Sequence, residues 1–168
     1  MTLPPITAQI CILGFASLML WAAATDVRSL TIPNRISVAI VMLYPAYVLA
    51  AGHPVDWSGA LIVAGSLLAV GFVAFALGLI GGGDAKLLTA GALWAGPAQL
   101  MEFLFLTALA GGGMATVLWL RHRLSRAAAP AMLLSTPSDP DFAKQPMPYA
   151  VAVAAGALYV AFTNLSIG

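Results

Sequence analysis

Long uninterrupted runs of apolar residues limit most strongly what this chain can fold into. Of its 168 residues, 61% are hydrophobic and only 8% are Asp, Glu, Lys or Arg, whereas a soluble domain carries about 25% charged residues. So little charge cannot cover a water-exposed surface, and it excludes intrinsic disorder, which requires low hydrophobicity and high charge. We therefore predict an all-α integral membrane protein, because continuous apolar runs are typical of spanning helices and not of the alternating strands of a membrane barrel.

Six apolar segments are candidates for crossing the membrane, for which a helix needs about 20 residues. We predict six transmembrane helices in a single polytopic domain over residues 1–168, at about residues 6–25, 36–51, 57–80, 85–95, 99–120 and 148–165. The segment 85–95 is short and ends at Gly96-Pro97, so we expect it to lie partly in the protein interior. Residues 121–146, rich in Ala, Ser and Pro from residue 127 onward, are predicted to form a flexible cytoplasmic loop.

The basic residues orient these predicted helices. Six crossings place all seven Lys and Arg residues on one side of the membrane: Arg28, Arg35, Lys86, Arg121, Arg123, Arg126 and Lys144. The positive-inside rule identifies that side as cytoplasmic, so both termini are predicted to face outward. The first segment lacks the positive n-region of a signal peptide, and we expect it to be retained as a helix.

Charge and residue counts exclude several other classes of protein. The net charge is only +1, without a basic stripe, so nucleic-acid binding is unsupported. One cysteine, Cys11, and two histidines, His53 and His122, leave too few side chains for a disulfide framework or a zinc centre. The histidines are expected on opposite faces of the membrane, so neither serves a serine nucleophile as a base. We expect no metal and no cofactor.

The six carboxylates fall into two groups. Four are expected to face water, near the outer surface or in the long loop: Asp56, Glu102, Asp139 and Asp141. Asp26 and Asp84 instead lie at the cytoplasmic ends of predicted membrane segments, so the topology brings them to the same depth. Paired carboxyls suit peptide-bond hydrolysis, because an ionised one takes a proton from water while a protonated one hydrogen-bonds the scissile carbonyl. The glycines at 81–83 would let a substrate backbone approach Asp84 closely.

Each aspartate also has a structural interpretation. Asp84 can N-cap the helix that follows its three glycines, and Asp26 can pair with Arg28 or Arg35. Two non-enzymatic functions therefore stay open: a membrane carrier with the aspartates as an ion relay, and an assembly subunit in which they only cap helices. The expected helix dipoles favour Asp84 as the ionised base and Asp26 as the proton donor, although Arg28 and Lys86 could reverse this order.

Three stretches together carry a family signature. Asp26-Val27-Arg28 continues to Thr31-Ile32-Pro33-Asn34, Gly81-Gly82-Gly83-Asp84-Ala85-Lys86 follows, and Met147-Pro148-Tyr149-Ala150 opens the last predicted helix. This combination resembles the type IV prepilin peptidases, aspartyl proteases of the Gly-x-Gly-Asp kind in the bacterial inner membrane. The resemblance covers essentially the whole chain in order, spacing and topology.

The resemblance implies a catalytic pair, Asp26 and Asp84, at the cytoplasmic face. It implies as substrate the basic N-terminal leader of a type IV prepilin or pseudopilin, which is cut just before the apolar helix. The further active-site and substrate-loop residues are Gly81, Gly82, Gly83, Lys86, Arg28, Pro33 and Asn34. Pro33 is expected to fix the chain entering the second helix and Asn34 to cap it, while Lys86 either tunes Asp84 or contacts lipid headgroups.

One departure from the family pattern concerns cysteine. Larger prepilin peptidases carry an additional cytoplasmic domain with paired Cys-x-x-Cys motifs and also N-methylate the new pilin terminus, whereas this chain has one cysteine. It is therefore similar to the minimal tight-adherence (Tad/Flp pilus) branch, and we expect cleavage without methyl transfer or S-adenosylmethionine. The oligomeric state is left open.

Overall fold

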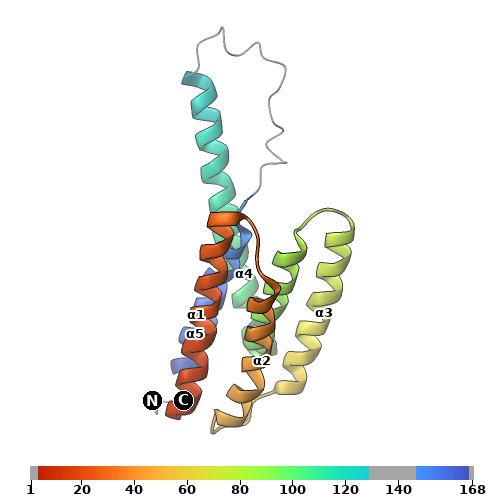
Figure 1. Cartoon of the computed structure of the whole chain (residues 1–168), viewed down its shortest axis with the longest axis vertical. Helices are drawn as coiled ribbons and strands as arrows, with labels where there is room; N and C mark the ends of the chain where they lie inside the picture. The colour runs from red at the N-terminus through yellow and green to blue at the C-terminus, as the bar shows by residue number, and fades with distance from the viewer. Residues whose placement is uncertain (1–3, 129–146, 167–168) are drawn as a thin grey trace.

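The computed structural model describes residues 4–128 and 147–166, and all regular structure in this part of the chain is helical. The helices are α1 (Ile6–Ser29), α2 (Asn34–Ala50), α3 (Trp57–Ala76), α4 (Gly82–Ala128) and α5 (Tyr149–Ser166) (Figure 1). Four of them are long and apolar enough to cross a membrane, namely α1, α3, α4 up to Leu124, and α5, while α2 is apolar but shorter. The all-α class is confirmed, and the four long apolar helices are consistent with a membrane protein.

A sharp reversal divides α4 into two helices. Gly96 has φ 58° and ψ −174°, a conformation that glycine adopts far more readily than other residues, and Pro97 follows it without an N–H for a continuing helix. The second half folds back so closely that a Cβ atom on Gly91 would lie 2.7 Å from the ring of Phe103. The halves match the predicted segments 85–95 and 99–120, and residues 90–95 are buried, as expected for the shorter one.

Three predicted helix ends were wrong. α1 runs four residues past its predicted end and closes where Leu30, in the left-handed conformation, donates its N–H to the Asp26 carbonyl. α3 ends at Ala76 instead of 80, before a turn in which Gly78 has φ 71°. α4 continues to Ala128, so residues 121–128 are helical, and the rest of the predicted loop, 129–146, lies outside the described residues. Hydropathy marks where an apolar run stops, whereas capping geometry fixes where a helix stops.

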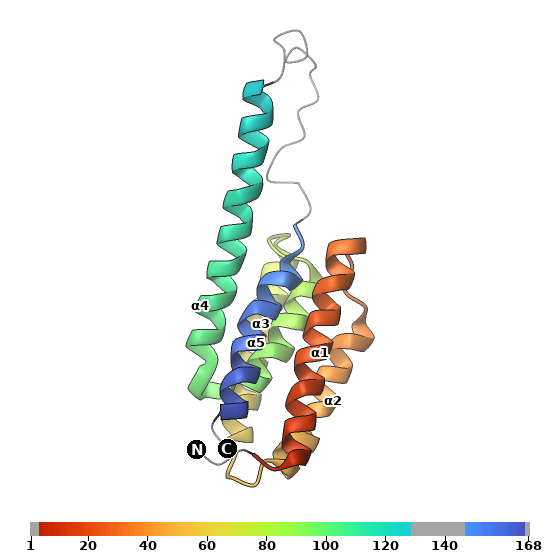
Figure 2. The ribbon, with the colours of Figure 1, turned by 90° about the vertical axis from the view of Figure 1, so that its left-hand side faces the viewer.

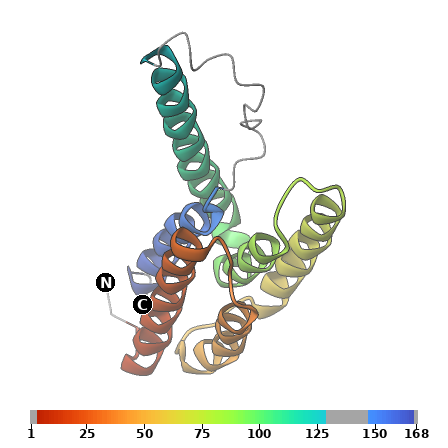
Figure 3. The same ribbon diagram turned by 45° about the horizontal axis from the view of Figure 1, so that its top comes forward.

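The helices pack around the first half of α4. α2 and α3 flank that half, α5 packs on the second half, and α1 lies against α5 and α2 (Figures 2 and 3). The α1–α2 link, the α3–α4 link and the start of α5 lie at one end of the bundle, opposite the start of α1 and the end of α5, and the second half of α4 extends past that end (Figure 1). The described segments that carry predicted functional residues therefore meet at one end of the bundle.

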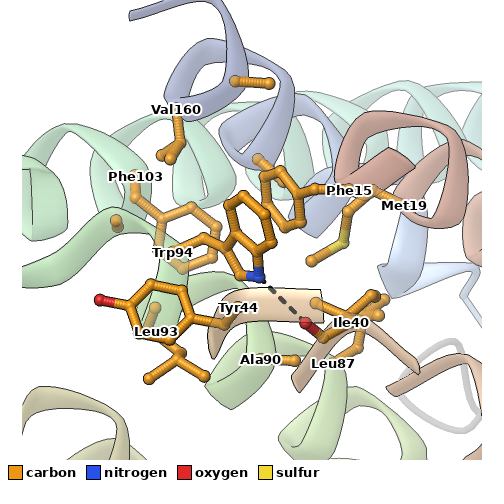
Figure 4. Close-up of a cluster of buried hydrophobic side chains, with 14 of the residues drawn as sticks. Phe15, Met19, Ile40, Tyr44, Leu87, Ala90, Leu93, Trp94, Phe103 and Val160 are labelled. Carbon is orange, nitrogen blue, oxygen red and sulfur yellow. Dashed lines mark hydrogen bonds between the residues drawn. The ribbon is translucent and has the colours of Figure 1, made fainter. Parts of the chain in front are cut away.

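Trp94 joins three helices in the core (Figure 4). Its indole stacks on Phe15 of α1 with ring centroids 4.4 Å apart and on Tyr47 of α2 at 5.1 Å, and it meets Tyr44 edge-on at 5.7 Å. The indole N–H donates to the Ile40 carbonyl of α2 at 3.1 Å. Aromatic pairs add about 0.5–1.5 kcal/mol each beyond the area they bury, so this cluster sets the spacing of α1, α2 and α4.

We expect Trp94→Ala to lower the free energy of unfolding by about 3–5 kcal/mol, because it leaves a cavity where three helices meet. Trp21→Ala is the matched control, since Trp21 is 57% exposed and faces outward. Unfolding of both variants in mixed detergent micelles measures the difference. Equal losses would contradict a central role for Trp94.

Candidate active site

A cavity of about 310 Å³ at the loop end of the bundle contains both predicted aspartates. It is lined by the end of α1, the α1–α2 link, the start of α2 and the start of α4: Asp26, Leu30, Thr31, Ile32, Asn34, Gly81, Gly82, Gly83 and Asp84. The stretches that resembled a family signature at residues 26–34 and 81–84 thus form one site. Carboxylates 58 positions apart in sequence share its wall.

The core packing explains why the two aspartates lie at the same height. Phe15 of α1 stacks on Trp94 of α4, and from that contact α1 runs toward the cavity while α4 arrives from it. Asp26 lies 11 residues after Phe15 and Asp84 lies 10 residues before Trp94. At 1.5 Å per residue these separations correspond to about 16 and 15 Å. The stacked rings therefore align both carboxylates at one end of the bundle.

Asp26 is buried and bonded to a second helix. It lies in the last turn of α1 and is only 5% exposed. Its Oδ2 accepts a hydrogen bond of 2.9 Å from the backbone N–H of Ala150, in the first turn of α5. The carboxylate thus occupies the N-terminus of α5, where free N–H groups and the helix dipole favour negative charge.

Asp84 is half-buried in the first turn of α4. Its carboxylate accepts a hydrogen bond from the backbone of Gly81, which precedes the helix, and it interacts electrostatically with Asp26. A Cβ atom on Gly81 would lie 2.7 Å from Oδ2 of Asp84, so only glycine leaves that oxygen its present position. Each aspartate is therefore held by a backbone N–H at the start of a helix.

These contacts correct two expectations and add a new contact that bears on a third. Asp84 is not the N-cap, because α4 begins at Gly82, although its carboxylate still caps by reaching back to Gly81, as the third helical residue does in a capping box. In the described chain Asp26 bonds Ala150 instead of pairing with Arg28 or Arg35. Asp26 and Asp84 lie at a helix C-terminus and a helix N-terminus as expected, but the start of α5 also lies against the Asp26 carboxylate, so the assignment of Asp26 as proton donor stays a prediction.

Of the remaining predicted site residues, some lie as expected and others do not. Pro33 precedes α2 as expected, but Asn34 does not cap that helix. Its Oδ1 instead accepts a hydrogen bond of 3.0 Å from Nζ of Lys86, which ties α2 to α4. Arg28 is exposed in the last turn of α1 and does not line the cavity. The N–H of Ala150 is a site group that the sequence does not predict, although Ala150 belongs to the signature stretch 147–150.

Metal-binding side chains do not gather at this site. Among the residues that the structure describes, no group of three or more His, Cys, Asp or Glu side chains is arranged to hold a metal ion. The cavity instead offers two carboxyls, backbone amides and glycines, which are groups suited to acid–base chemistry on a peptide.

We expect Asp26→Ala to destabilise the protein by about 1–3 kcal/mol, because it leaves the buried Ala150 N–H without an acceptor. Asp26→Asn retains an oxygen in the same place and should cost much less. Thermal unfolding of both variants in detergent compares them. Equal stability of the two variants would show that the bond to Ala150 does not support the fold.

Comparison with known proteins identifies the family. The sequence profile of the type IV leader peptidase family matches residues 13–116, a range that includes both aspartates and the glycines before Asp84. No curated protein and no solved structure matches the chain significantly. The match covers more than half of the chain and confirms the family resemblance, while the tight-adherence branch is not distinguished. The chain belongs to the type IV leader peptidase family.

Proposed function

We propose that this protein is a membrane aspartyl endopeptidase that removes the short basic leader of a type IV prepilin or pseudopilin, of the Flp type, with Asp26 and Asp84 as its catalytic pair. Family membership supports a prepilin leader peptidase. The observation that carries the assignment of the pair is the single cavity lined by both carboxylates, beside three glycines. The carrier and assembly-subunit alternatives have no comparable support.

The reaction needs one proton acceptor and one proton donor. An ionised carboxylate takes a proton from water, whose oxygen attacks the scissile carbonyl carbon, while the protonated partner donates to the carbonyl oxygen. The tetrahedral intermediate then collapses, the C–N bond breaks, and the new amine takes a proton from the site. Water is thereby divided between the carboxyl end of the leader and the amino end of the mature pilin.

The backbone around the pair supports one shared negative charge. Ala150 donates to Asp26 and Gly81 to Asp84, each from the N-terminal end of a helix. Positive helix ends stabilise anions, and two carboxyls at close range share a proton because they cannot easily both ionise. Both aspartates therefore have a backbone donor that supports the ionised form.

The six-crossing topology gives the proposed enzyme its orientation in the bacterial inner membrane. α1, α2, α3, the two halves of α4 and α5 supply the crossings, with the aspartates at the cytoplasmic face and both termini outside. Arg28, Arg35 and Lys86 then lie on the positive side. The leader is presented from the cytoplasm, and no methyl transfer follows cleavage.

We expect Asp26→Asn and Asp84→Asn each to reduce leader removal by at least about 10³-fold, because each removes a carboxyl that must exchange a proton. Asp56→Asn is the matched control. Asp56 caps α3 by accepting the Gly59 N–H at 2.8 Å, far from the cavity, and asparagine caps equally well. Co-expression with a tagged Flp-type prepilin, followed by gel and mass analysis of the pilin, measures cleavage.

Membrane levels of the three variants must match that of the wild type. Cleavage by either Asp26→Asn or Asp84→Asn at the wild-type rate would remove that aspartate from the mechanism. Loss of cleavage in Asp56→Asn as well would indicate a general defect of folding.

We expect Gly81→Ala to reduce cleavage by about 10–100-fold, because the new methyl group displaces the Asp84 carboxylate, and misplacement by about 1 Å can cost that much. Gly112→Ala is the control, since a Cβ atom at Gly112 meets nothing within 4 Å. Initial rates on purified prepilin in detergent give the comparison. Equal rates for the two variants would show that the position of Asp84 does not depend on Gly81.

A further inference from the structure

A lateral groove opens between α2 and α3, next to the aspartate cavity. It has a volume of about 460 Å³ and is lined by Asn34, Ser37, Val38, Val41, Met42, Leu68, Lys86 and Thr89. α2 and α3, both described in full, make hardly any direct contact with each other. The first half of α4 lies between them (Figure 3), and its Lys86 and Thr89 line the groove.

The groove is continuous with the proposed active site. Asn34 lines both the groove and the aspartate cavity and marks the junction between them. Lys86, which also lines the groove, donates a hydrogen bond to the Asn34 side chain. From there the walls become apolar, with Val38, Val41 and Met42 exposed along one side of α2. A chain leaving the aspartates along α2 therefore passes from a polar junction into an apolar channel.

The groove and a second hollow, which lies between the same two helices farther from the aspartates, together make up the cleft between α2 and α3. The hollow measures about 400 Å³ and is lined by residues of α2 and α3: Tyr44, Pro45, Val48, Leu49, Trp57 and Leu61. Asn34 to Leu49 covers 15 helical steps, or about 22 Å of α2. The cleft thus follows α2 for almost its whole length, which suits a helix lying alongside better than a compact ligand.

We propose that this cleft binds the apolar helix of the substrate, the part of the prepilin that follows the cleaved bond. This inference rests on the proposed function and adds where the substrate lies. The leader ends at the aspartates, the cut bond lies in the cavity, and the helix descends between α2 and α3 toward the opposite membrane face. An apolar occupant is required, because the walls offer few polar groups beyond the junction at Asn34.

The direction of the cleft agrees with the direction of the substrate. A prepilin enters with a basic leader on the cytoplasmic side and continues into an apolar helix within the membrane. The cleft likewise begins at Asn34, next to the aspartate cavity, and continues to Leu49, along α2, which runs from that end of the bundle to the opposite one (Figure 1). The cleft and the substrate therefore share the same order, a polar end followed by an apolar stretch.

Site-specific photocrosslinking tests this placement without requiring catalysis. Benzoylphenylalanine is introduced at Val41 or Leu68 in the full chain, each combined with Asp84→Asn to prevent cleavage. The controls carry it at Leu109 or Phe162, which are also exposed and apolar, 61% and 69% respectively, but lie outside the cleft. After irradiation of membranes that contain a tagged prepilin, we expect at least fivefold more prepilin adduct from the cleft positions.

The outcomes separate this inference from the proposed function. Equal prepilin adducts at cleft and control positions overturn the inference, as do adducts only with lipid or with a second copy of the chain. Cleavage by the wild type without cleft adducts overturns the inference alone. Cleft adducts without wild-type cleavage support the binding site and overturn the peptidase assignment. If neither cleft adducts nor wild-type cleavage is seen, both the binding site and the peptidase assignment are overturned.

Measurement of KM and kcat for prepilin cleavage tests the binding site independently. Val41→Trp and Leu68→Trp narrow the cleft and should raise KM for prepilin at least tenfold with little change in kcat, because they affect binding and not the carboxyl pair. Leu109→Trp should leave both constants unchanged. An unchanged KM in both cleft variants contradicts the proposal.

Discussion

The indole of Trp94 holds α1, α2 and the first half of α4 at fixed positions through two stacked rings, one edge contact and a hydrogen bond to the backbone of α2. In a membrane, apolar surface gains little from leaving lipid, so shape complementarity and specific contacts decide how helices associate. Because α1 carries Asp26 and α4 carries Asp84, the same cluster determines where the carboxylates meet. Helix packing and site geometry are therefore consequences of one interaction.

The site combines two helix beginnings with two carboxylates. α5 brings the Ala150 N–H to Asp26, and the turn at Gly81 brings another to Asp84. A buried carboxylate usually requires such partners, and both aspartates line the cavity as well. The same backbone contacts that cap the two helices therefore also serve the proposed chemistry. The structural and the catalytic interpretation of these aspartates do not exclude each other.

Much of this organisation could be predicted from residues alone. Sparse charge singled out Asp26 and Asp84, and the apolar runs with Gly96-Pro97 located the helices and the reversal in α4. The Ala150 N–H could not be predicted, because a backbone donor has no sequence signature and its partner lies 124 positions away. The same limit explains Asn34, whose capping preference is local, whereas its actual partner, Lys86, comes from another helix. Sequence identified the chemically active side chains, and tertiary contacts decided what holds them.

Two of the elements around the site are short. α2 has 17 residues, about 25 Å, and the first half of α4, from Gly82 to Gly96, is about 22 Å long at 1.5 Å per residue. A typical hydrocarbon core is about 30 Å thick, and lipid adapts to short helices by thinning locally. In the proposed topology the bilayer is therefore thinnest beside the aspartates and the cleft. In that topology water reaches the peptide bond at a depth that elsewhere around the protein is hydrocarbon, so the proposed hydrolysis depends on membrane thickness as well as on the carboxyl pair.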